Sequence, residues 1–210
     1  MMNVKSLIIA SMVVALCPFS LLHAQFNAGI SIGEEGLRGF YLAIGNYYKV
    51  PERQIVIIKD RHIPPEEAPV MLFIAARARV TPSAVIDLRL AGKSWMDITI
   101  HYGLSPEIFY VPVTVAVSGP PYGKAYGYFK NRPKKEWKKI VLTDAEVINF
   151  VNLKFVSEHY GYAPEKVIRM KEKGSSFVAI HDEVKKAKAG KAHKVKEAKG
   201  KEKKGKGGKK

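Results

Sequence analysis

The sequence predicts a mainly α-helical protein made of helix-turn-helix-like units, and three observations lead to this prediction. Apolar residues recur at steps of three and four positions, as in Trp95, Ile98 and Tyr102, which is the spacing of a helix face packed against a core. Prolines and glycines stand where helices begin and end. A stretch of the chain also recurs 82 positions further along. We therefore expect antiparallel or crossed helices around a shared apolar core.

The repeat aligns "PSAVIDLRLAGKSWMDI" (82–98) with "PEKVIRMKEKGSSFVAI" (164–180) without gaps. A fainter third copy, which places Pro51 on Pro82, lies 31 residues upstream, and its second half is degenerate. The pattern predicts two clear helix-turn-helix-like units and one degenerate unit. The matches between the two clear copies include Pro82 with Pro164, Arg89 with Lys171, Gly92 with Gly174, Trp95 with Phe177 and Ile98 with Ile180.

The helix boundaries follow from backbone chemistry. Proline suits the first turn of a helix, where its missing N–H would be unpaired anyway, so helices are expected to start at Pro51, Pro82 and Pro164. Glycine suits the left-handed position that ends a helix, which predicts stops at Gly92 and Gly174. The residue that caps the next helix start is expected to be Ser94 or Lys93 after Gly92, and Ser175 or Ser176 after Gly174; a further helix start is expected at Thr143 or Asp144.

An insert over 104–143 separates the two clear copies. Its segment "FYVPVTVAV" (109–117) is β-branched and partly alternating, which predicts an extended or edge segment limited by Pro112. The following "GPPYGKAYGYF" (119–129) combines glycine and proline, which favour turns. We expect this Gly/Pro/Tyr-rich insert to bridge the helical units. Its tyrosines either pack on the helical body as anchors or offer flat faces to a ligand: Tyr122, Tyr126 and Tyr128.

The first 24 residues are typical of an export signal. Lys5 supplies a basic start, residues 7–16 an apolar run, and a small residue precedes Gln25 at the expected cleavage point. A lipid anchor on Cys17 is the alternative, but the bulky Leu16 does not fit the usual lipoprotein pattern. Cys17 is the only cysteine in the chain, so the mature protein would depend on an apolar core and not on disulfides.

The net charge of +16 is concentrated in two segments. Residues 185–210 hold thirteen lysines against two glutamates, and residues 124–139 hold seven basic residues against one glutamate. The remaining body is close to neutral. The tail has Val195 as its one larger aliphatic and no aromatic residue, which predicts disorder. The predicted organisation is a signal peptide (1–24), helical repeat units (25–103), an extended aromatic and basic insert (104–143), a second helical unit (144–184) and a disordered Lys-rich tail (185–210).

The stretch "GKSWMDITIHYGLSPEIFY" (92–110) resembles the helix-turn-helix of resolvase-like and other bacterial regulators. In such proteins the second helix enters the major groove of DNA. Here that helix would meet Pro112 within a few residues, and it offers Glu107, Phe109 and Tyr110 where basic or amide side chains would be needed. We expect packing of helix pairs and no sequence-specific reading of DNA.

No motif with catalytic or cofactor chemistry stands out. The carboxylates are scattered beside basic residues, as on solvated helix faces, and the sequence contains no nucleophile elbow, phosphate-binding loop or dinucleotide fingerprint. The histidines lack the spacing of a metal site and are expected at surfaces or helix ends. The prediction is therefore no catalytic residue, no metal and no cofactor. The histidines of the body are His62, His101, His159 and His181.

Cations interleaved with aromatic residues are typical of surfaces that bind sugars, phosphate-rich polymers or single strands. The sequence predicts an exported, non-catalytic envelope or extracellular protein that binds an anionic polymer or membrane surface, non-specific nucleic acid included, through its tail and insert. Two alternatives stay open: an envelope enzyme acting on cell-wall or surface polymer, and a structural partner of envelope proteins in a periplasmic assembly. The predicted ligand-binding residues are Tyr122, Tyr126, Tyr128, Lys134, Lys135, Trp137, Lys138 and Lys139.

Overall fold

The structure is a computed structural model that describes residues 34–190, and within this range the chain is mainly helical, without a β-strand. This confirms the predicted fold class at its coarse level. The α-helices are α1 (Glu34–Tyr48), α2 (Glu52–Asp60), α3 (Ala68–Ala78), α4 (Pro82–Leu90), α5 (Trp95–His101), α6 (Gly123–Lys130), α7 (Asp144–Tyr160) and α8 (Pro164–Glu172), followed by a helix over 177–190. Short 3-10 helices are η1 (Pro65–Glu67), η2 (Pro106–Phe109) and η3 (Lys134–Lys139).

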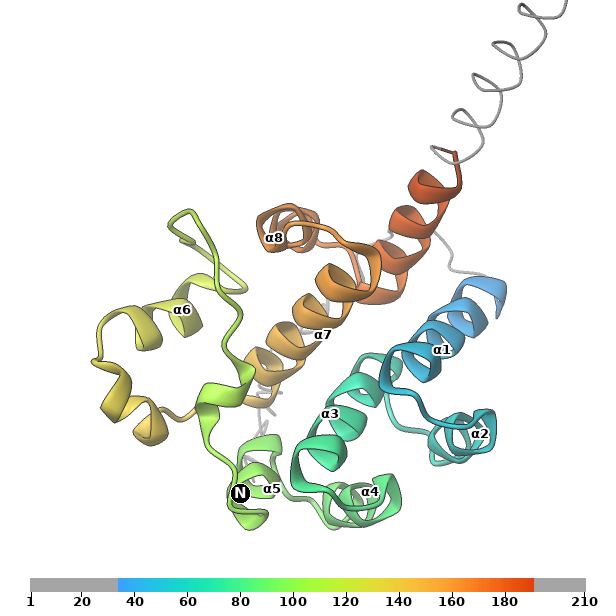
Figure 1. Ribbon diagram of the computed structural model, residues 1–210, viewed down its shortest axis with the longest axis horizontal. Helices are drawn as coiled ribbons and strands as arrows, with labels where there is room; N and C mark the ends of the chain where they lie inside the picture. The colour runs from blue at the N-terminus through green and yellow to red at the C-terminus, as the bar shows by residue number, and fades with distance from the viewer. Residues whose placement is uncertain (1–33, 191–210) are drawn as a thin grey trace, which may run out of the picture.

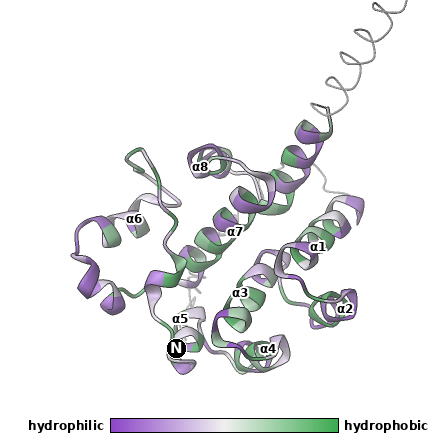
Figure 2. Cartoon of the chain, in the orientation of Figure 1, coloured by the Kyte–Doolittle hydropathy of each residue, from purple (hydrophilic) through white to green (hydrophobic). Residues whose placement is uncertain are grey.

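Helices α3 and α7 form the centre of the molecule, and the other elements pack around them (Figure 1). Helix α3 contacts α1, α4 and α7, while α7 also contacts α5 and α8. Every residue of α3 from Ala68 to Ala75 is buried, because "APVMLFIA" is apolar on all sides and such a helix needs neighbours all round. In Figure 2 the helices are green mainly where they face their neighbours and purple toward solvent.

The termini of several helices confirm the boundary predictions. Ser94 and Thr143 each form a capping box with the acid three residues later, at the starts of α5 and α7. Gly92 and Gly174 follow α4 and α8 with φ of +84° and +87°, where a side chain would be strained. Each glycine stops its helix and lets the next one start at a new angle. Ser176 accepts the N–H of Ala179 and so caps the helix over 177–190.

A carboxylate at the start of α7 binds the start of α5. Asp144 Oδ1 accepts the backbone N–H of Trp95 at 2.7 Å, and its Oδ2 pairs with Arg89 at 2.6 Å. The Arg89 guanidinium lies 4.6 Å from the centre of the Trp95 ring and also binds Glu67, with N–O distances of 2.8 and 3.1 Å. This cluster ties α4 and α5 to the N-terminus of α7.

A second carboxylate, just before α3, makes the same kind of contact with the helix over 177–190. Glu66 Oε1 accepts the backbone N–H of Phe177 at 2.6 Å, and its Oε2 lies 3.7 Å from the Lys171 ammonium group. Lys171 lies 4.7 Å from the centre of the Phe177 ring. In both clusters one carboxylate satisfies the first N–H of a helix, which has no acceptor inside that helix.

The insert differs from its prediction. Residues 123–130 and 134–139, predicted as parts of an extended insert, form the helices α6 and η3. Local i→i+3 and i→i+4 hydrogen bonds become available there once the aromatic side chains dock on the core. Residues 110–118 have no regular secondary structure; an edge segment needs a strand to pair with, and residues 34–190 supply none. Predicted disorder is wrong for residues 185–190, which continue the last helix. The rest of the tail and the predicted signal peptide lie outside the described residues.

Candidate functional site

The strongest concentration of one charge in the described part of the chain lies on α6, η3 and the turn that joins them. Glu136 is the one acidic residue between positions 124 and 139. None of the basic residues in this segment makes a salt bridge within residues 34–190. We call this surface the basic segment. Its cations are all exposed: Lys124, Lys130, Arg132, Lys134, Lys135, Lys138 and Lys139.

Trp137 fixes the basic segment to the core. Its indole N–H donates to the backbone oxygens of Phe129 and Arg132, both at 3.1 Å. Its ring lies against Tyr110 and Phe129, with centroid distances of 4.8 and 5.0 Å. The side chain is only partly exposed. Trp137 therefore acts as an anchor that holds the neighbouring lysines on the outside of η3.

Two of the predicted ligand-binding tyrosines belong to the core. Tyr122 and Tyr126 are 1 % and 6 % exposed, and the Tyr126 hydroxyl donates to the backbone oxygen of Val111 at 2.8 Å. Burial raises the pKa of both phenols. A surface ligand cannot reach them, so the ligand-binding prediction fails at these two positions. The anchoring alternative describes them, because large aromatic rings gain most by burial against the helical body.

Tyr128 is partly exposed, but its ring already has basic neighbours. The ammonium of Lys124 and the guanidinium of Arg132 lie 6.0 and 5.9 Å from its centre, and Lys134 lies 5.9 Å from the centre of the Trp137 ring. Such contacts use the negative face of an aromatic ring. The aromatic residues of the basic segment are thus engaged by its own cations, while the four lysines of η3 project into solvent.

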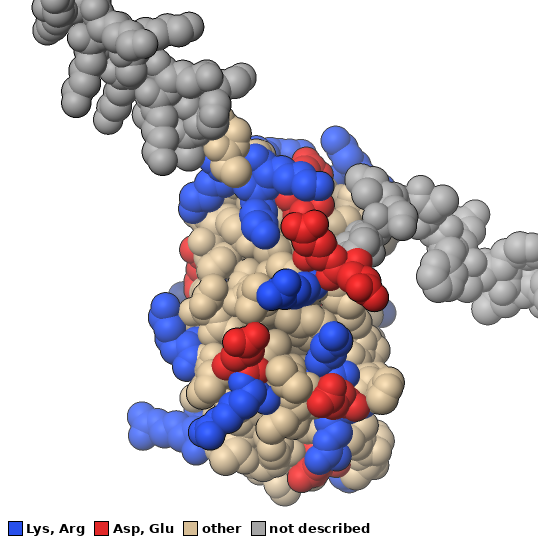
Figure 3. Space-filling view, turned by 90° about the vertical axis from the view of Figure 1, so that its right-hand side faces the viewer, with Lys and Arg blue, Asp and Glu red and all other residues tan. Residues whose placement is uncertain are grey.

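The opposite side of the molecule has a different charge pattern. Figure 3 looks onto the side of α1 and α2, and it shows Lys and Arg interspersed with Asp and Glu. Helix α6 lies at the left of Figure 1, away from α1 and α2, and a short turn connects it to η3. The face of α1 and α2 therefore lacks the excess of one sign of charge that the basic segment has.

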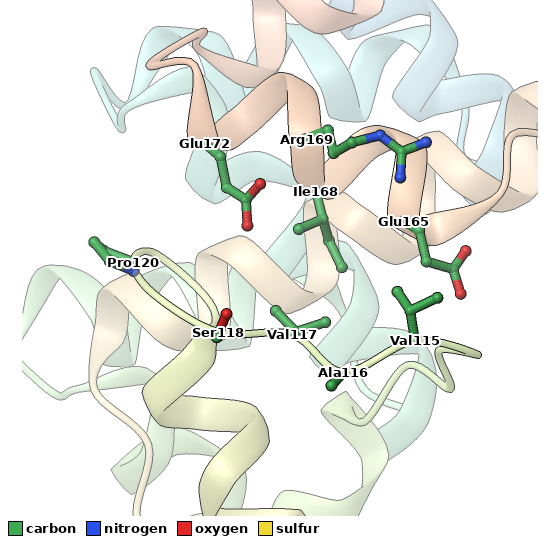
Figure 4. A pocket seen from close by; sticks show the side chains of 9 residues that line it. All are labelled: Val115, Ala116, Val117, Ser118, Pro120, Glu165, Ile168, Arg169 and Glu172. Carbon is green, nitrogen blue, oxygen red and sulfur yellow. The ribbon is translucent and has the colours of Figure 1, made fainter.

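A groove of about 580 Å³ lies between residues 115–120 and α8 (Figure 4). Ile168 and Val117 provide apolar lining, and charged side chains of α8 line the other wall. These α8 residues were not among the predicted site residues; the signal that could have found them is an i, i+4, i+7 spacing, which places them along one side of a helix. The charged residues are Glu165, Arg169 and Glu172.

Glu165 ties the groove wall to the insert. One of its carboxylate oxygens accepts both the backbone N–H of Thr114, at 2.6 Å, and the Thr114 hydroxyl, at 2.8 Å. These hydrogen bonds stabilise the ionised form and lower the pKa of Glu165. A carboxyl group held in this way is suited to fixing the loop and not to donating a proton as a general acid.

The histidines are more varied than predicted. His62 and His101 are exposed, as expected, whereas His181 is 1 % exposed and its Nδ1 lies 2.7 Å from the Tyr160 hydroxyl. Burial lowers the pKa of His181 to about 4. The surface prediction is wrong for His181, because its position in the last helix faces Phe40 of α1. Within residues 34–190, no three His, Cys, Asp or Glu side chains gather as metal ligands would.

Within the described range, no helix has the length and apolar character needed to cross a membrane. No family model matches the chain, and neither a curated protein nor a solved structure shows significant similarity to it. The functional assignment therefore depends on the chemistry of the described surface.

Proposed function

We propose that this protein is an exported, non-catalytic interaction protein that binds anionic polymers or surfaces through the basic segment and the Lys-rich tail. One observation carries the proposal: seven exposed cations without an acidic partner in the described structure lie on a segment that buried aromatic side chains fix to the core. Export rests on the first 24 residues alone and would be tested by cell fractionation with detection of the processed N-terminus.

The geometry of η3 favours a linear or planar array of negative charges. In a 3-10 helix, residues three apart lie on the same side, with a rise of about 2 Å per residue. Lys135 and Lys138 therefore project from one side about 6 Å apart along the axis, and Lys134 and Lys139 flank them. Phosphates, sulfates or carboxylates at similar intervals would displace counterions from these ammonium groups, and the release of counterions would drive binding.

The positions of the aromatic residues indicate that the surface would recognise its ligand by charge and not by stacking. Tyr122 and Tyr126 are buried, and Tyr128 and Trp137 have basic side chains over their rings. Few aromatic faces are therefore free for stacking against nucleobases or sugar rings, which is the contact that usually adds selectivity to a cationic surface. We expect affinity to follow the charge density of the ligand and to vary little with base or sugar identity.

The test compares two variants that remove four charges each. One carries Lys→Gln at positions 134, 135, 138 and 139; the matched control carries Lys→Gln at positions 49, 93, 166 and 173, which are also exposed. Binding to heparin, to DNA and to vesicles with anionic lipid is measured across a salt series, in full chains and in chains ending at residue 190.

For DNA, the η3 variant should lose about 3 to 4 units of slope in log affinity against log salt, as expected for four lost phosphate contacts. The control should lose much less. Equal losses in the two variants would show that only net charge matters and would refute a site on η3. Loss of all binding on truncation at residue 190 would assign the function to the tail alone.

The internal repeat belongs to the same proposal, and the paired carboxylate contacts support it. Arg89 and Lys171 are matched residues of the two copies, as are Trp95 and Phe177. In each copy the cation lies over the ring of the matched aromatic residue, and a carboxylate from elsewhere binds both that cation and the aromatic residue's N–H. We propose that the two copies are structurally equivalent units bridged by the insert.

The groove beside α8 is the feature of the described structure that could serve as an active site if the protein were an envelope enzyme. Glu165 and Glu172 both line it, as a carboxylate pair for polymer hydrolysis would. Glu165, however, is engaged by Thr114 and has a lowered pKa. Incubation with cell-wall polymer, with Glu172→Gln as the comparison, tests this alternative: polymer cleavage that Glu172→Gln abolishes would favour the enzyme.

A further inference from the structure

Helix α2 has apolar residues on its outer side as well as on its inner side. Its central residues are "IVII" (55–58), of which Ile55 and Ile58 are buried in the core. Val56 and Ile57 are 47 % and 43 % exposed. A helix that is apolar on both sides normally has a neighbour on each. In the described structure, the outer side of α2 has none.

Shallow grooves flank this outer side. One, of about 410 Å³, lies between α1 and α2 and is lined by Leu42 and Val56 together with charged residues at its rim. Another, of about 220 Å³, lies between α2 and α4 and includes Ile57. Figure 3 looks onto this side and shows uncharged surface between side chains of both signs. The apolar surface thus extends beyond α2 itself and is framed by charges.

The charged residues of α2 are arranged so that the helix is complementary to a second, antiparallel copy of itself. Its N-terminal end has Glu52 followed by Arg53, and its C-terminal end has Lys59 followed by Asp60, all four exposed. Residues seven apart lie on the same side of a helix but about 10 Å apart along it, too far to bind each other. Within residues 34–190, none of the four makes a salt bridge.

We propose that two copies of this protein associate through α2, with the two α2 helices antiparallel about a twofold axis near Val56. In this arrangement Glu52 faces Lys59 of the second copy, and Arg53 faces Asp60 of the second copy. Twofold symmetry forms each of these pairs twice. Val56 and Ile57 of both copies fill the centre, and the flanking grooves accept side chains from the other copy. An unrelated partner helix would have no reason to match this charge order.

The dimer is compatible with the proposed function but does not depend on it. Helices α2 and α6 lie on opposite sides of the molecule (Figure 1), so association through α2 leaves both basic segments exposed. The contact is built on a helix of nine residues and its two grooves, which indicates a small interface and a reversible, concentration-dependent dimer.

Sedimentation velocity of the full chain over a wide concentration range tests the proposal. The wild-type protein should approach twice the monomer mass as concentration rises. Glu52→Lys should weaken association about tenfold, because two attractive pairs become repulsive, and Lys59→Glu should do the same. The double variant Glu52→Lys/Lys59→Glu should restore it, since it only exchanges the partners.

Glu107→Lys, at an exposed acid of η2, is the matched control and should associate like the wild type. Far-UV circular dichroism verifies that each variant is folded. A wild-type protein that stays monomeric at every concentration overturns the proposal. So do single variants that associate normally, and so does a double variant that remains as weak as the single ones.

Discussion

Removal of the Asp144 carboxylate should destabilise the fold far more than removal of an exposed carboxylate nearby. In Asp144→Ala the N–H of Trp95 loses its acceptor, and Trp95 is 0 % exposed. An unsatisfied buried donor costs about 1 to 3 kcal/mol. Loss of the partly exposed ion pair with Arg89 adds about 0.2 to 1 kcal/mol. We expect a total loss of about 2 to 3 kcal/mol in the free energy of unfolding.

Urea unfolding followed by circular dichroism measures this loss, and thermal unfolding should show a Tm lower by about 5 to 10 °C. Asp87→Ala is the control: Asp87 is exposed on α4 and makes no side-chain hydrogen bond within residues 34–190, so its effect should stay within about 0.5 kcal/mol. If the two variants were equally stable, the carboxylate would not hold α5 to α7. Glu66→Ala should resemble Asp144→Ala if the two clusters are equivalent.

Four further substitutions test the core and the backbone. His181 is neutral when buried, with a pKa of about 4 in the folded protein against about 6.5 in the unfolded chain. Its contribution to the free energy of unfolding is therefore complete above pH 6.5 and falls as the pH drops toward 4. Over this pH window the wild-type protein should lose on the order of 3 kcal/mol more free energy of unfolding than His181→Phe loses. Equal pH profiles would contradict a buried, neutral His181. Tyr126→Phe removes the hydrogen bond to the buried Val111 oxygen and should cost about 1 kcal/mol in urea unfolding, whereas a cost near zero would mean that water replaces it. Gly161 has a φ of +68°, so Gly161→Ala should destabilise the protein by about 1 kcal/mol. Gly127 lies inside α6 with open space around it, so Gly127→Ala should stabilise the protein by up to about 1 kcal/mol. Calorimetry that gave the two changes the same sign would refute this contrast.

The sequence predicts the structure well where neighbouring residues decide it. Gly92 and Gly174 end their helices because only glycine adopts positive φ without strain. Ser94 and Thr143 cap theirs because a short side-chain oxygen reaches the N–H three residues on. The exposed lysines of η3 follow from the cost of burying a charge.

Three tyrosines of the insert show what a local sequence pattern leaves open: Tyr122, Tyr126 and Tyr128. All three stand in the same Gly/Pro-rich stretch, and the sequence left open whether they anchor the insert or face a ligand. Tyr122 and Tyr126 are buried and Tyr128 is half-buried. Tyr122 at the N-cap of α6 and Tyr126 within it face Phe150 of α7, whereas Tyr128 is left at the surface. The helical phase of a short segment depends on the surface against which it docks, and that surface comes from residues far along the chain.

The sequence by itself determined the helical class, several helix starts and stops outside the insert, and the location of the positive charge, since these follow from φ preferences, capping chemistry, apolar spacing and solvation of single residues. The tertiary structure alone decided which partners meet. It brought Asp144 to Trp95 and Glu66 to Phe177, buried His181 against α1, and left Val56 and Ile57 of α2 uncovered. These contacts join residues distant in sequence, and their energies depend on packing geometry that local patterns do not encode.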